Sequence, residues 1–577
     1  MKTKPRRIHL DSIPHKYKGK TYYSHLLRTS NREGKDVSHE TLSNVSCLPS
    51  ETLYVLKQSL AGKHMMAIED ILITERTTPT GHVRAVLGTM KNLGIAELVA
   101  SRPSRERDLV MGMIAQRILD PKSKLASIRL WHTSTLAADL EIEDARVEEI
   151  YPALEWLWKR KERIEGKLAR RHLSHGELAL YDMSNSKYEG EHCPLAKRGR
   201  DKAGRHGVLL ISYSVLTDAD GRPIGLEVYP GNTGDSSTVF EQALKLRDRF
   251  GLEDMILVGD RGMLTDGKID VLKKYPGVGW ITALRSEPIR NLLDGEILQL
   301  SLFDERNLAE IQSPDFPGER LVACFNPLLA EERSRKRDEL LRSTEKNFEK
   351  IRKEAQRRTK KPLSDAELGS KVGVARAQYK VGKHFIVTIG NGKFEYSRNE
   401  ESIRREREMD GIYVLRTNQP RERIASAEVV RDYKRLAEVE RAFRCMKGPD
   451  LQAAPIFLRL EDRVKAHYLL CFLAYYVEWH MRKLLAPLLY QDESLPEERS
   501  RRDPVAKAEP TEWAKLKKSS KRTSDGFIVH DFHTLLKELS MQSKVRYRVM
   551  GAPEEAVFDQ IGAPTPIQKK AFDLLGL

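Results

Sequence analysis

Apolar runs of strand length alternate with amphipathic helical stretches from residue 177 onward, and this alternation constrains the fold more than any other feature. GELALYDMS precedes HGVLLISYSVLT and RPIGLEVYP, two alternating runs joined by a hairpin turn at 218–221. A helix over 236–250, the strand DMILVGD, a helix around KIDVLKKY and the strand GWITALR come next. A hairpin-linked antiparallel set followed by parallel strands that cross over through helices predicts an α/β fold, with a mixed sheet flanked by helices.

The balance of charge favours a polyanionic partner. Lys and Arg number 99 against 83 Asp and Glu, which gives a net charge of +16. Neutralising phosphates with Lys and Arg releases counterions, and this term supplies most non-specific affinity for nucleic acid. Charge alone leaves open the alternative of a large basic protein that is merely soluble.

No feature of the sequence predicts a membrane protein or a disulfide framework. The longest apolar run, Tyr468–Val477, is shorter than the ~20 residues that span a bilayer, so we expect a buried helix there. The basic N-terminus has no apolar core behind it, which predicts a cytoplasmic protein without a signal peptide. Five cysteines are scattered without CxxC spacing, which argues against disulfides and a structural zinc site.

The chain divides into six predicted regions. Residues 1–100 hold a β-hairpin around a turn at 31–34 and a helical region, and residues 101–175 form a helical, basic region that either binds DNA or is simply solvated. Together they predict a mostly helical N-terminal DNA-binding part, with helices over 104–120 and 153–173. Residues 176–285 and 411–490 are the two parts of the sheet, and residues 286–410 between them form a β-rich insertion with a charged helical hairpin. Residues 491–577 form a mobile basic linker with a small appended tail.

Two acidic residues end apolar strands of the predicted sheet. Asp182 ends LALYD, and Asp260 ends MILVGD and is followed by Arg261. Functional sites of open sheets gather at the carboxyl ends of strands, so we expect both carboxylates at one site. For either residue alone, a turn or a helix cap is an equally ordinary explanation. The same two explanations, site lining or a Gly-rich turn that caps a helix, stay open for Asn232 and Asp235 in GNTGD.

A third acid, Glu440, lies in a predicted helix over 427–447. At about 100° per residue, Tyr433, Arg444 and Lys447 share its polar stripe, while a neighbouring apolar stripe can pack on the sheet. The alternative is an exposed Glu440–Arg444 pair worth about 0.3–0.5 kcal/mol, which does not explain why Tyr433 and Lys447 share the line.

Three converging carboxylates would repel one another and suit hard divalent cations. Mg²⁺ (or Mn²⁺) prefers oxygen ligands, and two ions ~3.5–4 Å apart can promote an in-line phosphoryl displacement. Tyr433, Arg444, Lys447 and Arg261 would then hold DNA phosphates beside the ions.

Several separate blocks of the sequence occur in the order typical of one protein family. They are YDMSNSKYEG, GLEVYPGNTGD, ILVGDRGM, WITALR, DYKRLAEVERAFRCMK and LEDRVKAHYLLCFLAYYVEWHMR. With these blocks the chain resembles insertion-sequence transposases of the DDE type, in the superfamily whose third acid lies in a Tyr/Arg/Glu/Lys signature.

This resemblance implies a ribonuclease-H-like core with Asp182, Asp260 and Glu440 as catalytic, metal-binding acids. It also implies a β-rich insertion before the helix with the Glu, which is where 286–410 falls. Tyr433 and Lys447 fit the signature spacing. The position of its Arg is Leu436 here; Arg435 faces elsewhere, and Arg444 is on the matching face.

The sequence therefore predicts a DNA transposase that uses two Mg²⁺ or Mn²⁺ ions. It would act on double-stranded DNA, namely the terminal inverted repeats of its element and the target, as a homodimer or higher multimer. Two alternatives are a structure-selective nuclease without strand transfer and a catalytically inactive DNA-binding protein on the same scaffold.

Overall fold

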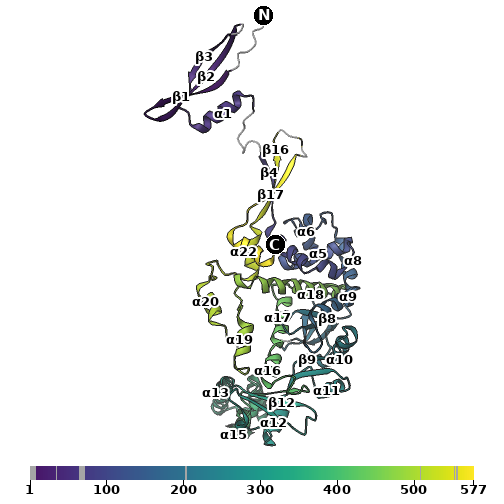
Figure 1. Ribbon diagram of the computed structural model, residues 1–577. Helices are drawn as coiled ribbons and strands as arrows, with labels where there is room; N and C mark the ends of the chain where they lie inside the picture. Colours follow the sequence, from purple (N-terminus) through teal and green to yellow (C-terminus); the bar gives the residue numbers. More distant parts are fainter. Residues whose placement is uncertain are drawn as a thin grey trace. The chain divides into compact units, whose positions relative to one another are not determined.

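The computed structural model describes residues 8–33, 36–63, 72–201, 204–506, 509–550, 553 and 556–577 (Figure 1). The chain forms two compact units. The smaller unit comprises Met1–Thr78 and Ser543–Gly562, and the larger one comprises Pro79–Gln542 and Ala563–Leu577.

The smaller unit is built mainly from β-strands. One antiparallel sheet has the order β1-β2-β3, from β1 (Ile8–Tyr17), β2 (Lys20–Glu33) and β3 (Asp36–Asn44), followed by α1 (Ser50–Leu60). A second sheet has the order β17-β16-β4, from β4 (Leu72–Pro79), β16 (Ser543–Val549) and β17 (Val557–Ile561).

The first strand, β1, was not expected, because the sequence predicted a single β-hairpin and a helical region in residues 1–100. Lys18 and Gly19 join β1 to β2 with φ of 49° and 76°, the left-handed pair that a two-residue hairpin turn requires. Pro14 disguises β1 in the sequence, but an edge strand tolerates a proline because one of its sides needs no ladder partner. The predicted strands around 31–34 are confirmed as β2 and β3, while Gly34 of their turn lies outside the described residues.

Helices dominate the beginning of the larger unit. They are α3 (Gly81–Asn92), α4 (Ile95–Val99), α5 (Arg105–Leu119), α6 (Lys124–Trp131), α7 (Leu136–Asp139), α8 (Val147–Trp158) and α9 (Lys161–His172). The helix predicted over 104–120 is confirmed as α5, with the Ser104 side chain accepting a hydrogen bond from the Arg107 N–H at 3.3 Å. The single helix predicted over 153–173 is wrong, because the chain turns at Lys159–Arg160 and separates α8 from α9.

A mixed sheet forms the centre of the larger unit, as the sequence predicted, and it has nine strands among the described residues. Its order is β11-β12-β15-β10-β9-β5-β7-β6, and β8 pairs with β7. Strands β5, β9 and β10 run parallel to one another, and the other pairings are antiparallel. The strands are β5 (Leu178–Lys187), β6 (Lys197–Arg200), β7 (His206–Thr217), β8 (Pro223–Pro230), β9 (Met255–Val258), β10 (Val278–Ala283), β11 (Leu308–Ile311), β12 (Arg320–Phe325) and β15 (Ile412–Thr417).

Helices cover both faces of this sheet. The crossover segments are η1 (Asp235–Ser237), α10 (Val239–Leu244), η2 (Lys245–Arg249) and α11 (Asp266–Leu272), and after the sheet come α16 (Ser426–Lys434), α17 (Leu436–Lys447) and α18 (Glu461–Leu484). The helix predicted over 427–447 is interrupted at Arg435, which separates α16 from α17. As expected, Tyr468–Val477 is buried within α18. Among the described residues, none of the helices has the length and apolar character needed to cross a membrane.

The insertion at 286–410 is mainly helical, which corrects the expectation of a β-rich one. Two of its strands, β11 and β12, extend the central sheet, so only the hairpin of β13 (Phe385–Gly390) and β14 (Lys393–Arg398) stands apart. Its helices are α12 (Ser286–Asp294), α13 (Pro327–Arg357), α14 (Asp365–Gln378) and α15 (Glu400–Arg407). The charged helical hairpin is confirmed as α13 and α14, with Leu341 and Phe348 in a separate small core.

The C-terminal region is folded where the structure describes it, so the predicted mobile linker is wrong. Helix α20 (Glu512–Ser520) follows α19 (Leu495–Arg501), and the ammonium group of buried Lys517 donates to the Ala486 carbonyl at 2.8 Å. Helices α21 (Phe532–Ser540) and α22 (Pro566–Leu575) pack on α3 through apolar faces. The last fifty residues are therefore divided between the two units and are no appended tail.

Candidate active site

Two predicted acids lie at the same level of neighbouring parallel strands. The expectation that Asp182 ends its strand is wrong, because β5 continues to Lys187 in its pairing with β7. Leu180 of β5 is in register with Val258 of β9, and Asp182 and Asp260 each come two residues later. Because neighbouring strands lie about 4.8 Å apart, this register brings both carboxylates to one place at the sheet. Asp182 is half-buried within β5, and Asp260 is exposed just after β9.

Alternation along β5 decides which face of the sheet carries Asp182. The hydroxyl of Tyr181 donates to Thr238 Oγ1 at 2.7 Å, and the same Thr238 oxygen lies 3.1 Å from the sulfur of Met183. Residues 182 and 184 therefore point to the opposite face. On that face α17 packs against β5, and the ammonium group of Lys447 donates to Ser184 Oγ.

Tyr433 of α16 connects the third acid to this place. Its hydroxyl donates to Asp260 Oδ1 at 3.3 Å. Burial raises the pKa of Tyr433 well above its usual value, and the negative charges of Asp260 and Glu440 raise it further, while Arg261 opposes them. Asp260, Arg261 and Glu440 thus all lie near enough to Tyr433 for their charges to act on its hydroxyl.

Glu440 and Arg444 do not form the surface ion pair that was the alternative explanation. Both side chains are exposed on α17. Within the described part of the chain, neither one makes an ion pair or a side-chain hydrogen bond. Glu440 is therefore an exposed carboxylate near Tyr433 that no cationic side chain of the described residues pairs with.

Leu436 stands where the signature has its Arg, and the neighbouring Arg435 does not replace it. Arg435 points to the hairpin turn between β7 and β8, where it donates to the Ala219 carbonyl at 3.1 Å and pairs with Asp432 at 3.3 Å. Arg261 is exposed, and its backbone N–H donates to Asp260 Oδ1 at 2.7 Å.

Lys447 is held more firmly than the sequence alone suggested. Besides its bond to Ser184, its ammonium group lies over the rings of Tyr213 and Phe443, at 5.6 and 5.9 Å from their centroids. The contact with Ser184 was missed, although its spacing of two residues from Asp182 on a strand could have indicated it.

In the segment GNTGD, the Asp235 carbonyl accepts a hydrogen bond from Thr238 Oγ1 at 2.9 Å in the turn before α10. This contact agrees with the alternative that GNTGD is a Gly-rich turn that caps a helix.

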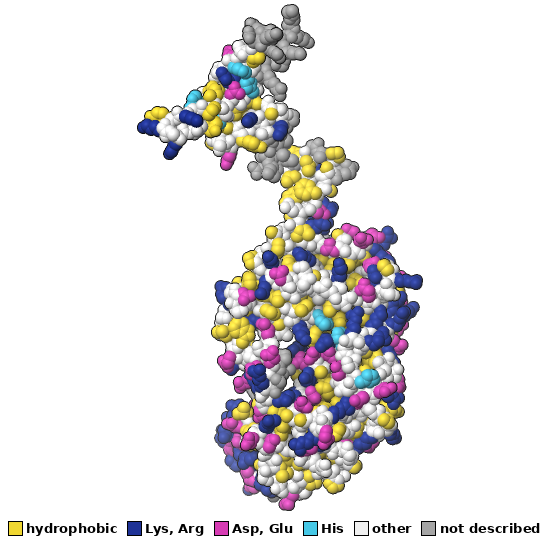
Figure 2. All heavy atoms as spheres, in the orientation of Figure 1, with side chains coloured by type: hydrophobic (Ala, Val, Ile, Leu, Met, Phe, Trp, Pro, Cys, Tyr) yellow, Lys and Arg dark blue, Asp and Glu magenta, His cyan; other side chains and the backbone are white. Residues whose placement is uncertain are grey.

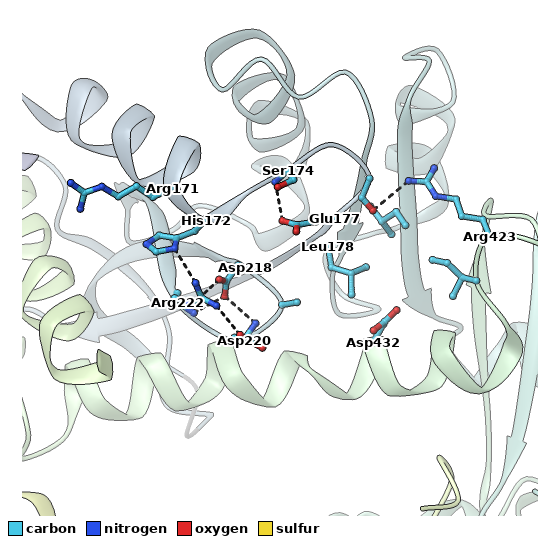
Figure 3. Close-up of a pocket in the computed structure, with 14 residues that line it drawn as sticks. Arg171, His172, Ser174, Glu177, Leu178, Asp218, Asp220, Arg222, Arg423 and Asp432 are labelled. Carbon is cyan, nitrogen blue, oxygen red and sulfur yellow. Dashed lines mark hydrogen bonds and ion pairs between the residues drawn. The ribbon is translucent and has the colours of Figure 1, made fainter. Parts of the chain in front are cut away.

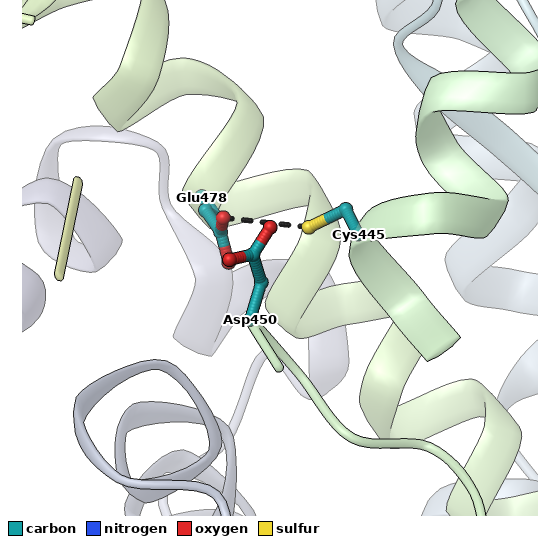
Figure 4. A group of neighbouring side chains, drawn as sticks. All are labelled: Cys445, Asp450 and Glu478. Carbon is teal, nitrogen blue, oxygen red and sulfur yellow. Dashed lines mark hydrogen bonds between the residues drawn. The ribbon is translucent and has the colours of Figure 1, made fainter. Parts of the chain in front are cut away.

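Among the described residues, the group whose metal-ligating atoms all lie within 4.8 Å of one another is Cys445, Asp450 and Glu478 (Figure 4), whereas Asp182, Asp260 and Glu440 do not come that close together. Arg482 already supplies a positive charge there, 3.1 Å from Asp450 and 2.5 Å from Glu478. Because that guanidinium neutralises the carboxylates, the group is explained as an ion-pair network, and Asp182, Asp260 and Glu440 remain the better candidates for a metal.

Residues 176–477 match the family described as "Transposase DDE domain". The chain is also similar to a solved structure described as "Cryo-EM structure of piggyBac transposase synaptic complex with hairpin DNA (SNHP)", with 10% identity and a TM-score of 0.33, over 69% of this chain and 71% of the other. No curated protein matches. Transposases of the DDE type use divalent metal ions. Because the family match covers more than half of its residues, this chain belongs to the transposase DDE domain family.

Proposed function

We propose that this protein is the DNA transposase of an insertion sequence, which cuts the ends of its element and joins the 3′-hydroxyls to target DNA. The observation that carries the proposal is that Asp182 and Asp260 lie at the same level of two parallel strands. Tyr433 donates a hydrogen bond to Asp260, and the charge of Glu440 acts on the same tyrosine. The strand order β8-β7-β5-β9-β10 supports a ribonuclease-H-like core. In the chain, the antiparallel strands β5, β7 and β8 come first, and they are followed by β9 and β10, which run parallel to β5.

Asp182, Asp260 and Glu440 would hold two Mg²⁺ or Mn²⁺ ions. Their donors are all carboxylate oxygens, the ligands that hard divalent cations prefer. Neither Asp260 nor Glu440 makes an ion pair with a described residue, so their charges are available to a cation. When bound, the ions would supply activation of a water or a 3′-hydroxyl and stabilisation of the leaving oxygen.

The surrounding side chains would position the acids and the DNA. The Tyr433 hydroxyl donates a hydrogen bond to Asp260 and so restricts the rotation of that carboxylate. Lys447, held by Ser184, would place a positive charge beside the phosphate next to Asp182. Arg261 and Arg444 are exposed and would contact neighbouring phosphates. Joining both element ends to one target would require a homodimer or higher multimer.

A strand-joining assay tests this proposal. A pre-cleaved duplex carrying the inverted repeat of the element is incubated with the full-length protein, a target plasmid and Mg²⁺ or Mn²⁺. We expect joined products that disappear with EDTA and in Asp182→Asn, Asp260→Asn and Glu440→Gln variants. Cleavage without joining would instead favour the structure-selective nuclease. DNA binding with no cleavage, unchanged by Glu440→Gln, would favour the catalytically inactive DNA-binding protein.

A further inference from the structure

One face of helix α9 carries a ridge of positive charge. Arg160, Arg163, Lys167, Arg170 and Arg171, here called the α9 ridge, fall within about 100° of one another on the helix. Arg163, Arg170 and Arg171 are exposed, and Arg160 and Lys167 are half-buried. Figure 2 shows Lys and Arg side chains gathered at the right-hand edge of the larger unit, the edge where α8 and α9 lie in Figure 1.

Ion pairing does not explain the α9 ridge. None of its five cations makes an ion pair with a described residue. Burial lowers the pKa of Lys167, and the nearby charges of Arg163, Arg171 and Arg170 lower it further. Like charges that crowd one another without a counter-ion are costly unless an anion binds to them.

The helix dipole explains only part of the α9 ridge. Cations near a helix C-terminus are favourable, which accounts for Arg170 and Arg171. Arg160 and Arg163 lie at the N-terminal end, where the dipole disfavours positive charge. These two residues therefore indicate a use beyond the stability of the helix.

The structure also holds the α9 ridge in place. The Arg171 guanidinium donates to the Leu93 carbonyl at 2.9 Å, Lys167 donates to the Leu98 carbonyl at 3.2 Å, and Arg160 stacks 3.6 Å above the ring of Trp156. On the opposite side of α9, buried Glu165 accepts from Lys245 at 2.8 Å and ties the helix to the sheet layer. Less side-chain entropy is lost when such fixed cations bind a polyanion.

One end of the α9 ridge leads toward the acids. Arg171 lines a cavity of about 550 Å³ whose wall includes Leu178 of β5, Ile256 of β9 and Asp432 of α16 (Figure 3). Leu178 precedes Asp182 by four residues on the same face of β5, and Asp432 precedes Tyr433. At about 3.3 Å per residue, the cavity lies roughly 13 Å from the candidate active site.

We propose that the α9 ridge binds the phosphate backbone of duplex DNA next to the cleaved phosphate, without reading its sequence. This inference rests on the proposed function and adds the surface that grips the substrate. From Arg160 to Arg171 the helix rises about 16 Å, and duplex DNA carries one charge per about 1.7 Å of its axis, so several phosphates face this surface.

The test compares two triple variants of the full-length protein for DNA binding over a range of salt concentrations. One is Arg163→Ala/Lys167→Ala/Arg170→Ala. The matched control, Arg404→Ala/Arg405→Ala/Lys515→Ala, removes three exposed cations that are already paired with Glu401 or Glu512. Binding to an element-end duplex and to a random duplex is followed by fluorescence anisotropy. A double variant, Arg163→Ala/Arg170→Ala, changes only exposed residues and guards against loss of folding.

For the ridge triple variant, we expect the negative slope of log K against log salt to become shallower by about 2–3. Each lost phosphate contact removes about 0.9 from the magnitude of that slope. Affinity for both duplexes should fall equally, and the double variant should show a smaller change of the same kind. Binding equal to that of the control would overturn the ridge inference, as would a loss confined to the element-end duplex. The proposed function stands whenever the wild-type protein joins strands, whatever the ridge variants show. A wild-type protein that binds no DNA would overturn both the proposed function and the ridge inference.

Discussion

Asp182 and Asp260 occupy the same level of two neighbouring parallel strands, because Leu180 and Val258 pair in register two residues before them. Two carboxylates in this position repel each other unless a cation lies between them. Tyr433 adds a hydrogen bond to Asp260 from the helix pair that also carries Glu440. The predictions below follow from this arrangement and from the ion pairs that support it.

Replacing a single acid with its amide should abolish most activity and leave the fold intact. We expect Asp260→Asn to lower cleavage by about 100-fold or more, the scale of losing one preorganised electrostatic group. Asp270→Asn, an exposed acid on the following helix, serves as the control and should cleave at the wild-type rate. Cleavage assays with labelled duplex DNA measure both; wild-type cleavage by Asp260→Asn would exclude this residue from the site.

Removing the Tyr433 hydroxyl should weaken the reaction without stopping it. Tyr433→Phe keeps the ring and loses only the bond to Asp260, so we expect about a 10-fold loss, as for other groups that orient a metal ligand. The metal concentration needed for half-maximal activity should rise as well. Tyr490→Phe, at a half-exposed residue, is the control. An identical metal titration for Tyr433→Phe and wild type would show that Asp260 needs no such restraint.

Buried Glu165 should contribute strongly to stability. Its carboxylate accepts from Lys245 Nζ and from the Leu226 N–H, each at 2.8 Å, and no part of the side chain reaches solvent. Glu165→Ala leaves Lys245 with fewer partners, and we expect a loss of about 3–5 kcal/mol in the free energy of unfolding. Glu162→Ala, on the exposed face of α9, should change that free energy by less than about 0.5 kcal/mol. Urea denaturation measures both variants, and equal midpoints would refute the role of Glu165.

His533 should make stability depend on pH near neutrality. Its hydrogen bond to Asp450 at 3.0 Å raises the pKa of His533 above the usual value of 6.5, Glu478 adds to the rise, and burial and Arg482 oppose it. A raised pKa means that the folded state binds the proton more tightly. The contribution is therefore complete below about pH 6.5 and disappears as the pH rises through the folded value.

Comparison of wild type with His533→Gln over this pH range tests the effect. Wild type should unfold at higher temperature than the variant at acidic pH, and the difference should shrink toward pH 8. His175→Gln, at an exposed histidine, should show no such trend. A difference between wild type and His533→Gln that is constant with pH would contradict the assignment.

The alternation of apolar residues determined the central sheet, because buried strands of a mixed sheet leave a pattern in the chain itself. The strands of 177–285 and the parallel arrangement of the strands with Asp182 and Asp260 followed from that pattern, although β5 runs past Asp182 to Lys187. Helical periodicity likewise placed α5, α13 and α18. The same reasoning failed at β1, where Pro14 hides an edge strand, and at 153–173 and 427–447, where single helices were expected.

Only the tertiary structure decided how the distant segments meet. No local pattern shows that β11 and β12 extend the central sheet, or that β16 and β17 pair with β4, since these contacts join residues far apart in the chain. The same holds for the bond between Tyr433 and Asp260 and for Lys447 at Ser184. The sequence by itself predicted the residues that we propose to carry the chemistry, because residue type and apolar pattern are local properties. How near they come to one another depends on strand register and helix packing, which exist only once the whole chain has folded.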